Sequence, residues 1–295
     1  MITNMITNMP VHEIYTVLFL NQKIMTDQIY CKAMDPVLFL NNVSFIRDGS
    51  IILHEISLCI RPGEHWAIIG QNGSGKTSLI SIINGYHRPS EGKAEVLGRR
   101  FGSADLRELR KHIGECSSEI KDMIHEWESV REIVLSGRFG SIGLYERPSP
   151  DDQERADELL EFFGLSQIQD RSFRTLSSGE QQKTVIARSL MPEPELLVLD
   201  EPCAGLDPKA REELLGALQN LCSMNGCPTL IYITHHIEEI IPAVTHALAL
   251  RKGEVIAKGT RKDVLTGEVL SRTFDMGMDV LERDGRLWPV VLRNP

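Results

Sequence analysis

The sequence predicts an α/β fold with a mainly parallel sheet, and the pattern of apolar residues supports this fold class. Short apolar runs, typical of buried parallel strands, occur at residues 66–69, 196–199 and 229–233. Apolar residues at helical spacing occupy residues 181–190 and 209–221, so helices alternate with strands along the chain. Such alternation is typical of a parallel sheet that is covered by helices on both faces. The 295 residues allow one sizeable α/β domain or two small ones.

The first 34 residues are predicted to form a poorly ordered extension, because their composition differs from that of the rest. Residues 1–4, Met-Ile-Thr-Asn, are repeated at once as residues 5–8, and further methionines follow up to Met34. Two alternatives stay open for this segment. Either the true start of the protein is Met34, or the segment is an arm that binds a partner.

The remaining chain is predicted to consist of one main domain at residues 35–265 and a small C-terminal tail at residues 266–295. Residues 37–60 show strand-like patterns on either side of a turn at residues 48–49, which predicts an N-terminal antiparallel β subdomain. Residues from about 119 to 175 are charged and have helical spacing. They are therefore predicted to form a helical insertion in the α/β core.

Residues 70–77 fit the phosphate-binding pattern G-x-x-x-x-G-K-[ST], and an apolar run precedes them while helical spacing follows. Glycines let successive backbone N–H groups turn toward phosphate oxygens, and a helix N-terminus adds positive potential. Lys76 is expected between the β- and γ-phosphates of a nucleotide, and the Thr77 hydroxyl on Mg²⁺. The alternative is a glycine turn that matches by chance. The predicted nucleotide contacts are Gly70, Gln71, Asn72, Gly73, Ser74, Gly75, Lys76, Thr77 and Ser78.

Two further strands are predicted to deliver polar side chains to the same edge of the sheet. The run at residues 196–199 ends in Asp200 and Glu201, so Asp200 is placed to hold Mg²⁺ and Glu201 to activate a water. His235 follows the second strand and is placed to donate a hydrogen bond to the γ-phosphate. Alone, such an acid pair would more often cap a helix, and a lone histidine would more often be structural. Beside a phosphate loop, they favour catalysis.

A second candidate anion site lies where Leu-Ser-Ser-Gly-Glu opens a predicted helix at residues 176–180. Ser177, Gly179 and Glu180 would present the N-terminus of that helix to a phosphate group. Because the chain already has one such loop, a second one suggests composite sites that another subunit completes.

The order of these motifs resembles that of the ATP-binding-cassette (ABC) ATPases, and the resemblance covers residues from about 37 to 265. It implies a P-loop NTPase (RecA-like) core that binds ATP and Mg²⁺ and hydrolyses ATP. It also implies a head-to-tail homodimer, or a pair with a related ATPase subunit, that encloses two ATP molecules. Gly-Leu-Asp at residues 205–207 would cross that interface. Each site would combine Lys76, Thr77, Asp200, Glu201 and His235 of one subunit with Ser177 and Gly179 of the other.

Three positions depart from the family pattern. Ser118 stands where family members usually carry a glutamine that touches Mg²⁺ and links the site to a transmembrane partner. A serine hydroxyl can still ligate Mg²⁺ but has a shorter reach, so coupling to a permease is in more doubt than ATP binding. Arg47 lies near the position of the usual adenine-stacking aromatic residue and is a candidate to stack on the base. The signature reads Ser-Ser-Gly-Glu, in which Ser177 and Gly179 are kept.

The resemblance predicts the ATP-hydrolysing subunit of an ABC transporter, peripheral on the cytoplasmic face of the membrane beside a permease. The segment around residues 136–140 and the Ser-Ser-Glu stretch are similar to ATPases of metal-chelate and molybdate importers. A net charge of −9 argues against a general nucleic-acid binder, and no apolar run approaches 18 residues. The alternative is a soluble ABC ATPase that acts as a switch in repair, translation or regulation. Ser118 favours that alternative, whereas the single cassette and the lack of a CxxC pair disfavour it.

Overall fold

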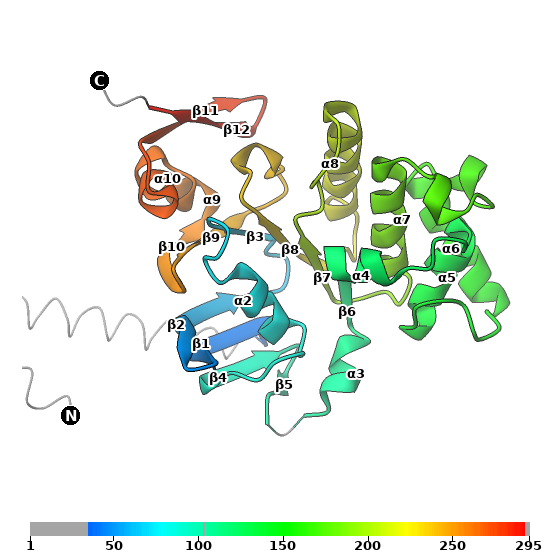
Figure 1. Ribbon diagram of the computed structural model, residues 1–295, viewed down its shortest axis with the longest axis horizontal. Coiled ribbons are helices and arrows are strands. Elements are labelled where there is room, and N and C mark those ends of the chain that lie inside the picture. Colours follow the sequence, from blue (N-terminus) through cyan, green and yellow to red (C-terminus); the bar gives the residue numbers. More distant parts are fainter. Residues whose placement is uncertain (1–34, 103, 293–295) are drawn as a thin grey trace, which may run out of the picture.

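The computed structural model describes residues 35–102 and 104–292, and its centre is a six-stranded sheet (Figure 1). The predicted extension at residues 1–34 lies outside the described residues. Strands of this sheet are parallel except for β10, which pairs antiparallel with β9 among the described residues. The mainly parallel sheet that the sequence predicts is therefore confirmed. In sheet order the strands are β10 (Glu254–Thr260), β9 (His246–Arg251), β3 (Trp66–Ile69), β8 (Thr229–Thr234), β7 (Leu196–Asp200) and β6 (Ile113–Cys116).

A separate antiparallel sheet precedes and follows the phosphate loop in the chain, as predicted. Its strands, in sheet order, are β2 (Ser50–Ile60), β1 (Leu38–Arg47), β4 (Glu91–Val96) and β5 (Arg99–Arg100). Asp48 and Gly49 both have positive φ and connect β1 to β2, where Arg47 pairs with Ser50. Two-residue hairpins favour this conformation because its twist matches that of the strands, and Asp-Gly adopts it readily.

Helices fill the stretch that is predicted as an insertion, which lies to one side of the central sheet (Figure 1). Two helices of this stretch, α5 and α6, and α7 directly after it begin with a capping box, in which a serine side chain and an acidic residue three positions later satisfy each other's backbone N–H groups. The domain boundary itself stays a prediction. The elements are α4 (Ser118–Met123), α5 (Val130–Ser136), η3 (Gly137–Phe139), α6 (Pro150–Phe162), η4 (Ser166–Ile168), η5 (Phe173–Thr175) and then α7 (Ser178–Leu190).

The C-terminal segment combines helices with a two-stranded hairpin. Val280 and Leu287 of the hairpin pack against the core. The segment comprises α9 (Arg261–Val264), α10 (Gly267–Phe274), β11 (Met278–Arg283) and β12 (Arg286–Val291). The other elements are α2 (Lys76–Ile83), α3 (Leu106–Arg110), α8 (Pro208–Cys222) and η6 (Ile237–Glu239). None of the helices in residues 35–102 and 104–292 is both long and apolar enough to cross a bilayer.

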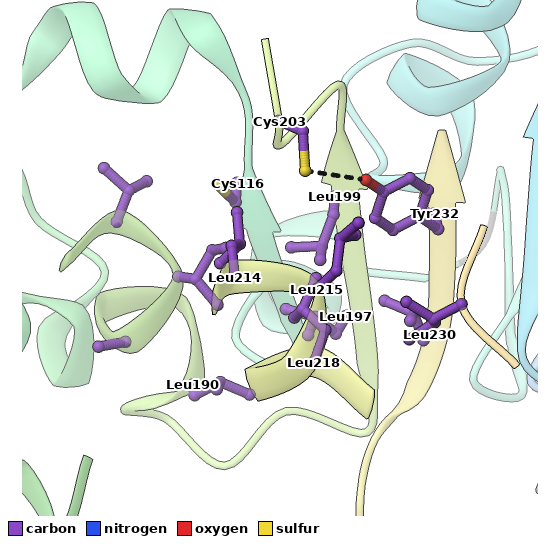
Figure 2. Packing of buried hydrophobic residues seen from close by; sticks show 14 of the residues in the cluster. Cys116, Leu190, Leu197, Leu199, Cys203, Leu214, Leu215, Leu218, Leu230 and Tyr232 are labelled. Carbon is purple, nitrogen blue, oxygen red and sulfur yellow. Dashed lines mark hydrogen bonds between the residues drawn. The ribbon is translucent and has the colours of Figure 1, made fainter. Parts of the chain in front are cut away.

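The central sheet is buried on both faces, and alternate residues of each strand enter two different core clusters. Leu197 and Leu199 belong to the cluster that α7 and α8 cover, whereas Leu196 and Val198 belong to the cluster with α2 and the antiparallel sheet. Figure 2 shows the first cluster, where the Tyr232 hydroxyl donates to Cys203 Sγ at 3.4 Å. Because both faces are apolar, polar side chains can emerge only where the strands end. This confines a site to the C-terminal edge.

Candidate functional site

A pocket of about 750 Å³ lies at that edge, between the phosphate loop, the end of β7 and the helix α4. It contains residues from three predicted motifs, which lie far apart in the sequence. Its size is that of a site for a nucleotide-sized ligand. The lining residues are Ile52, Asn72, Gly73, Gly75, Lys76, Thr77, Ser78, Ser118, Glu119, Lys121, Asp122, Gln182, Asp200, Glu201 and Ala204.

The phosphate loop has the compact form that its glycines permit. Gly75 has a φ of +103°, and an added Cβ would lie 2.7 Å from a methyl group of Leu53. At Gly70, a Cβ would lie 2.3 Å from the carbonyl oxygen of Leu250. No side chain fits at either position without rearrangement, so glycine is required by the turn and by close packing on neighbouring strands.

Lys76 curls back over the loop, where its Nζ donates to the carbonyl oxygens of Gly70 (2.9 Å) and Gln71 (3.2 Å). Burial lowers the pKa of this ammonium group, while the carboxylates of Glu201 and Asp200 act in the opposite direction. The Gln71 side chain turns away from the pocket and donates to the carbonyl oxygen of Phe274 at 2.5 Å. Gly70, Gln71 and Ser74 thus shape the loop but do not line the pocket.

Glu201 lies between the side chains of Lys76 and His235. Its Oε1 is 2.9 Å from Nδ1 of His235 and 3.9 Å from Nζ of Lys76. Glu201 has a left-handed backbone (φ +47°), and its N–H donates to the carbonyl oxygen of Ile233 at 2.9 Å. A non-glycine residue in this region is strained by roughly 1–2 kcal/mol, a cost often found at functional sites. The structure therefore brings together the predicted lysine, glutamate and histidine.

Asp200 ends β7 in an environment that disfavours its charge. Burial, and then the neighbouring carboxylates of Glu201 and Glu119, raise its pKa to about 6, although Lys76 acts in the opposite direction. A carboxylate with this surplus of negative neighbours is suited to a cation. Asp200 and the hydroxyls of Thr77 and Ser118 all line the pocket. One carboxylate with hydroxyls and phosphate oxygens fits Mg²⁺, which seldom uses an all-protein cage.

Asp200→Asn is expected to stabilise the free protein at pH 8 by about 1–2 kcal/mol, because it removes a disfavoured charge. The raised pKa means that the folded state binds this proton more tightly than the unfolded state. The resulting stabilisation of the wild type is present below about pH 4 and is lost as pH rises through about 6. Thermal unfolding at pH 8 and pH 4 should therefore show a gap that closes at the lower pH. Asp284→Asn at an exposed turn is the control, and equal stabilities at pH 8 would contradict the prediction.

Besides the three loop residues above, four predicted contact residues do not line the pocket of their own chain: Arg47, Ser177, Gly179 and Glu180. Ser177 and Glu180 form a capping box at the start of α7, with Ser177 Oγ donating to Glu180 Oε2 at 2.8 Å. A Cβ on Gly179 would lie 2.8 Å from Cβ of Ala210, so this glycine is also required where α7 packs on α8. Arg47 is 68% exposed and lies 3.8 Å from the carboxylate of Asp48.

Five polar or small residues of the pocket are not predicted from the sequence. Glu119, Lys121 and Asp122 lie on α4, while Gln182 lies on α7 and Ala204 follows β7. The sequence predicts α4 only as part of the charged helical insertion. Gln182 lies five residues after Ser177 on the same helix. The local sequence pattern does not indicate that Gln182 lines the pocket of its own chain whereas Ser177 does not.

A second pocket, of about 720 Å³, lies between α3, β6, η3 and the end of α7. The Arg188 guanidinium is 7% exposed and is held by Ser136 Oγ (3.3 Å) and the Ser141 carbonyl oxygen (2.9 Å). Burial lowers the pKa of this guanidinium, while the carboxylates of Glu115 and Glu128 act in the opposite direction. Asn84 also lines this pocket, is 1% exposed, and lies beside the carboxylate of Glu115.

Known proteins that resemble this chain are ATP-binding proteins of ABC transporters, which agrees with the nucleotide-sized first pocket and its phosphate loop. The ABC transporter family matches residues 53–204. An uncharacterized ABC transporter ATP-binding protein of Bacillus subtilis (strain 168), YlmA, is 43% identical over 251 residues, which is 85% of this chain and 95% of that protein.

Solved structures are similar along most of the chain. A putative metal-chelate type ABC transporter in an inward-facing conformation is 27% identical, with a TM-score of 0.70 over 88% of this chain and 98% of that one. The ATP-binding cassette MJ0796, in a dimeric post-hydrolysis state bound to ADP and phosphate, is 26% identical, with a TM-score of 0.65 over 76% of this chain and 98% of that one. The chain therefore belongs to the ABC transporter family and is an ATP-binding and ATP-hydrolysing subunit of a transporter.

Proposed function

We propose that this chain is a Mg²⁺-dependent ATPase that works as a head-to-tail dimer and drives a membrane permease from the cytoplasmic face. The observation that carries the proposal is the single pocket in which Lys76, Asp200 and Glu201 meet, with His235 bonded to Glu201. Each of these side chains has a distinct task in phosphoryl transfer.

Within one subunit, Lys76 binds the phosphates of ATP and Glu201 accepts the proton of the attacking water. Both close contacts of Glu201 involve Oε1, so Oε2 is the oxygen that faces a water. His235 positions the carboxylate through Nδ1 and presents its other ring nitrogen to the γ-phosphate. Thr77, Asp200 and Ser118 would hold Mg²⁺, which would supply positive charge to offset that of the phosphates.

The dimer completes each site with groups that lie outside the pocket of their own chain. Ser177, Gly179 and Glu180 stand at the N-terminus of α7, a favourable position for a phosphate of ATP bound to the other subunit. The dimeric form of MJ0796, with ADP and phosphate bound, supports this arrangement. A paired ATPase subunit with the same signature would serve equally. Arg47, at the exposed β1–β2 hairpin, is the proposed contact to adenine.

The second pocket is the proposed docking site of the permease. The buried Arg188 guanidinium is hydrogen-bonded to neutral oxygens, and the carboxylates of Glu115 and Glu128 only partly offset the cost of its burial. A cytoplasmic segment of the permease with an acidic side chain would add a favourable charge at this pocket. Arg110, which donates to the Gly85 carbonyl oxygen at 3.1 Å, and Lys111 add positive charge at the pocket.

The test is recovery of partners from native membranes with C-terminally tagged Glu201→Gln protein in ATP and Mg²⁺. A multi-spanning membrane protein in stoichiometric amount is expected, and Arg110→Glu should lower its recovery at least about tenfold. Arg283→Glu, an exposed change on β11, is the matched control and should leave recovery unaltered. Recovery of the soluble homodimer or of a soluble partner alone would contradict coupling to a permease and favour the soluble switch.

A further inference from the structure

We propose that Gln182 is a further ligand-binding residue of the nucleotide pocket. Its amide oxygen would face Mg²⁺ and the water molecules bound to that ion. The inference rests on the proposed function, because it assigns a role at the same site. Gln182 belongs to α7, the helix whose first turn is proposed to contact the other subunit. One helix would then serve two nucleotide sites, one from its N-terminus and one from its side.

The position of Gln182 supports this role. It is 9% exposed and lies in the second turn of α7, yet it lines the pocket together with Thr77, Ser118 and Asp200. The preceding residue, Gln181, points elsewhere, because its Nε2 donates to the carbonyl oxygen of Phe173 at 3.1 Å. Two identical side chains on one helix are thus directed to different surroundings, and only the second reaches the pocket.

The amide group of Gln182 is held in a defined orientation. Its Nε2 donates to Cys116 Sγ at 3.1 Å, inside the protein. Cys116 is fully buried at the end of β6 and pairs with Leu199, the residue before Asp200. With the nitrogen fixed on the strand side, the oxygen is left to face the pocket.

The charges of the pocket indicate why an amide oxygen suits this position. Four carboxylates (Glu119, Asp122, Asp200 and Glu201) and two ammonium groups (Lys76 and Lys121) line the pocket, and a triphosphate adds further negative charge. An uncharged oxygen contributes to a Mg²⁺ shell without adding to this repulsion. Ser118, the other uncharged oxygen donor on this side, has a shorter side chain and is 3.4 Å from Glu119 Oε2.

The experiment compares Gln182→Met with Gln181→Met, and uses Mn²⁺ as a spectroscopic probe in place of Mg²⁺. Binding of Mn²⁺ to the protein with a non-hydrolysable ATP analogue is followed by electron paramagnetic resonance. In Gln182→Met, which keeps the length of the side chain, we expect an affinity for Mn²⁺ about tenfold lower than in the wild type. Nucleotide binding in EDTA should be unchanged, and Gln181→Met should match the wild type in both measurements.

Gln182→Glu keeps an oxygen at this position, so it should restore Mn²⁺ affinity to the wild-type range or above. A merely structural role for Gln182 would instead lower nucleotide binding with and without metal, and Gln182→Glu would not restore it. That result, or wild-type Mn²⁺ affinity in Gln182→Met, would overturn the inference while leaving the proposed ATPase intact. If the wild-type protein with nucleotide binds no Mn²⁺, the proposed Mg²⁺-dependent function fails and the inference fails with it.

Discussion

Glu201→Gln is expected to lower the steady-state rate of ATP hydrolysis about 10²–10⁴-fold, because an amide cannot accept the proton of the attacking water. The substitution keeps the size of the side chain, and the amide oxygen can still accept the hydrogen bond from His235 Nδ1. ATP binding should therefore remain close to that of the wild type. With hydrolysis blocked, the ATP-bound dimer should accumulate.

Phosphate release at saturating ATP and Mg²⁺ measures the first effect, and size-exclusion chromatography with ATP measures the second. Glu195→Gln is a matched control, because Glu195 precedes the opposite end of the same strand and contacts His112 at 3.1 Å, away from the pocket. An unchanged rate in Glu201→Gln would contradict the role assigned to this carboxylate. A slowed rate in Glu195→Gln of similar size would show that the effect is not specific to the site.

Lys76→Ala is expected to weaken ATP binding by roughly 30–150-fold, which corresponds to about 2–3 kcal/mol. The ammonium group is 6% exposed and is held over the loop by two carbonyl oxygens, so it is already placed to meet phosphate. Its removal also takes away the ammonium group that lies 3.9 Å from Glu201 Oε1, which increases repulsion of the γ-phosphate.

Titration calorimetry with ATP and Mg²⁺ measures this loss. Lys183→Ala is the control, because Lys183 lies on α7 outside the pocket and pairs with Glu213 at 2.8 Å. Its expected affinity is that of the wild type. Tight ATP binding by Lys76→Ala would rule out the assignment of residues 70–77 as the phosphate-binding loop.

The parts of the fold that could be predicted from sequence depend on local rules. The six-stranded sheet follows from short apolar runs that alternate with helical patterns, and the hairpin turn follows from Asp48-Gly49. The phosphate loop is also a local feature, because one strand, one turn and one helix determine it. The family could also be predicted, because its motifs are short and follow a fixed order along the chain. The match of the ABC transporter family to residues 53–204 confirms this assignment.

The rest of the site depends on tertiary packing that no local pattern reveals. Gln182 reaches the pocket only because α7 packs beside β6, and Asp122 does so only because α4 follows that strand directly. Gly179 illustrates the converse difficulty. The sequence analysis attributed it to phosphate contact, yet the close approach of Ala210 alone would require a glycine there. The catalytic and binding roles of individual residues stay predictions until the variants above are measured.

The pairing of β3 has a consequence for how the protein is made. This strand leads directly into the phosphate loop, but its two neighbours in the sheet are β8 and β9, which come far later in the chain. Gln71 of the loop is likewise bonded to Phe274, at the end of α10. During translation, a nascent chain that has exposed only its first half carries an apolar strand without either partner. The ATP-binding loop is therefore synthesised well before the two strands that fix the position of β3 in the sheet.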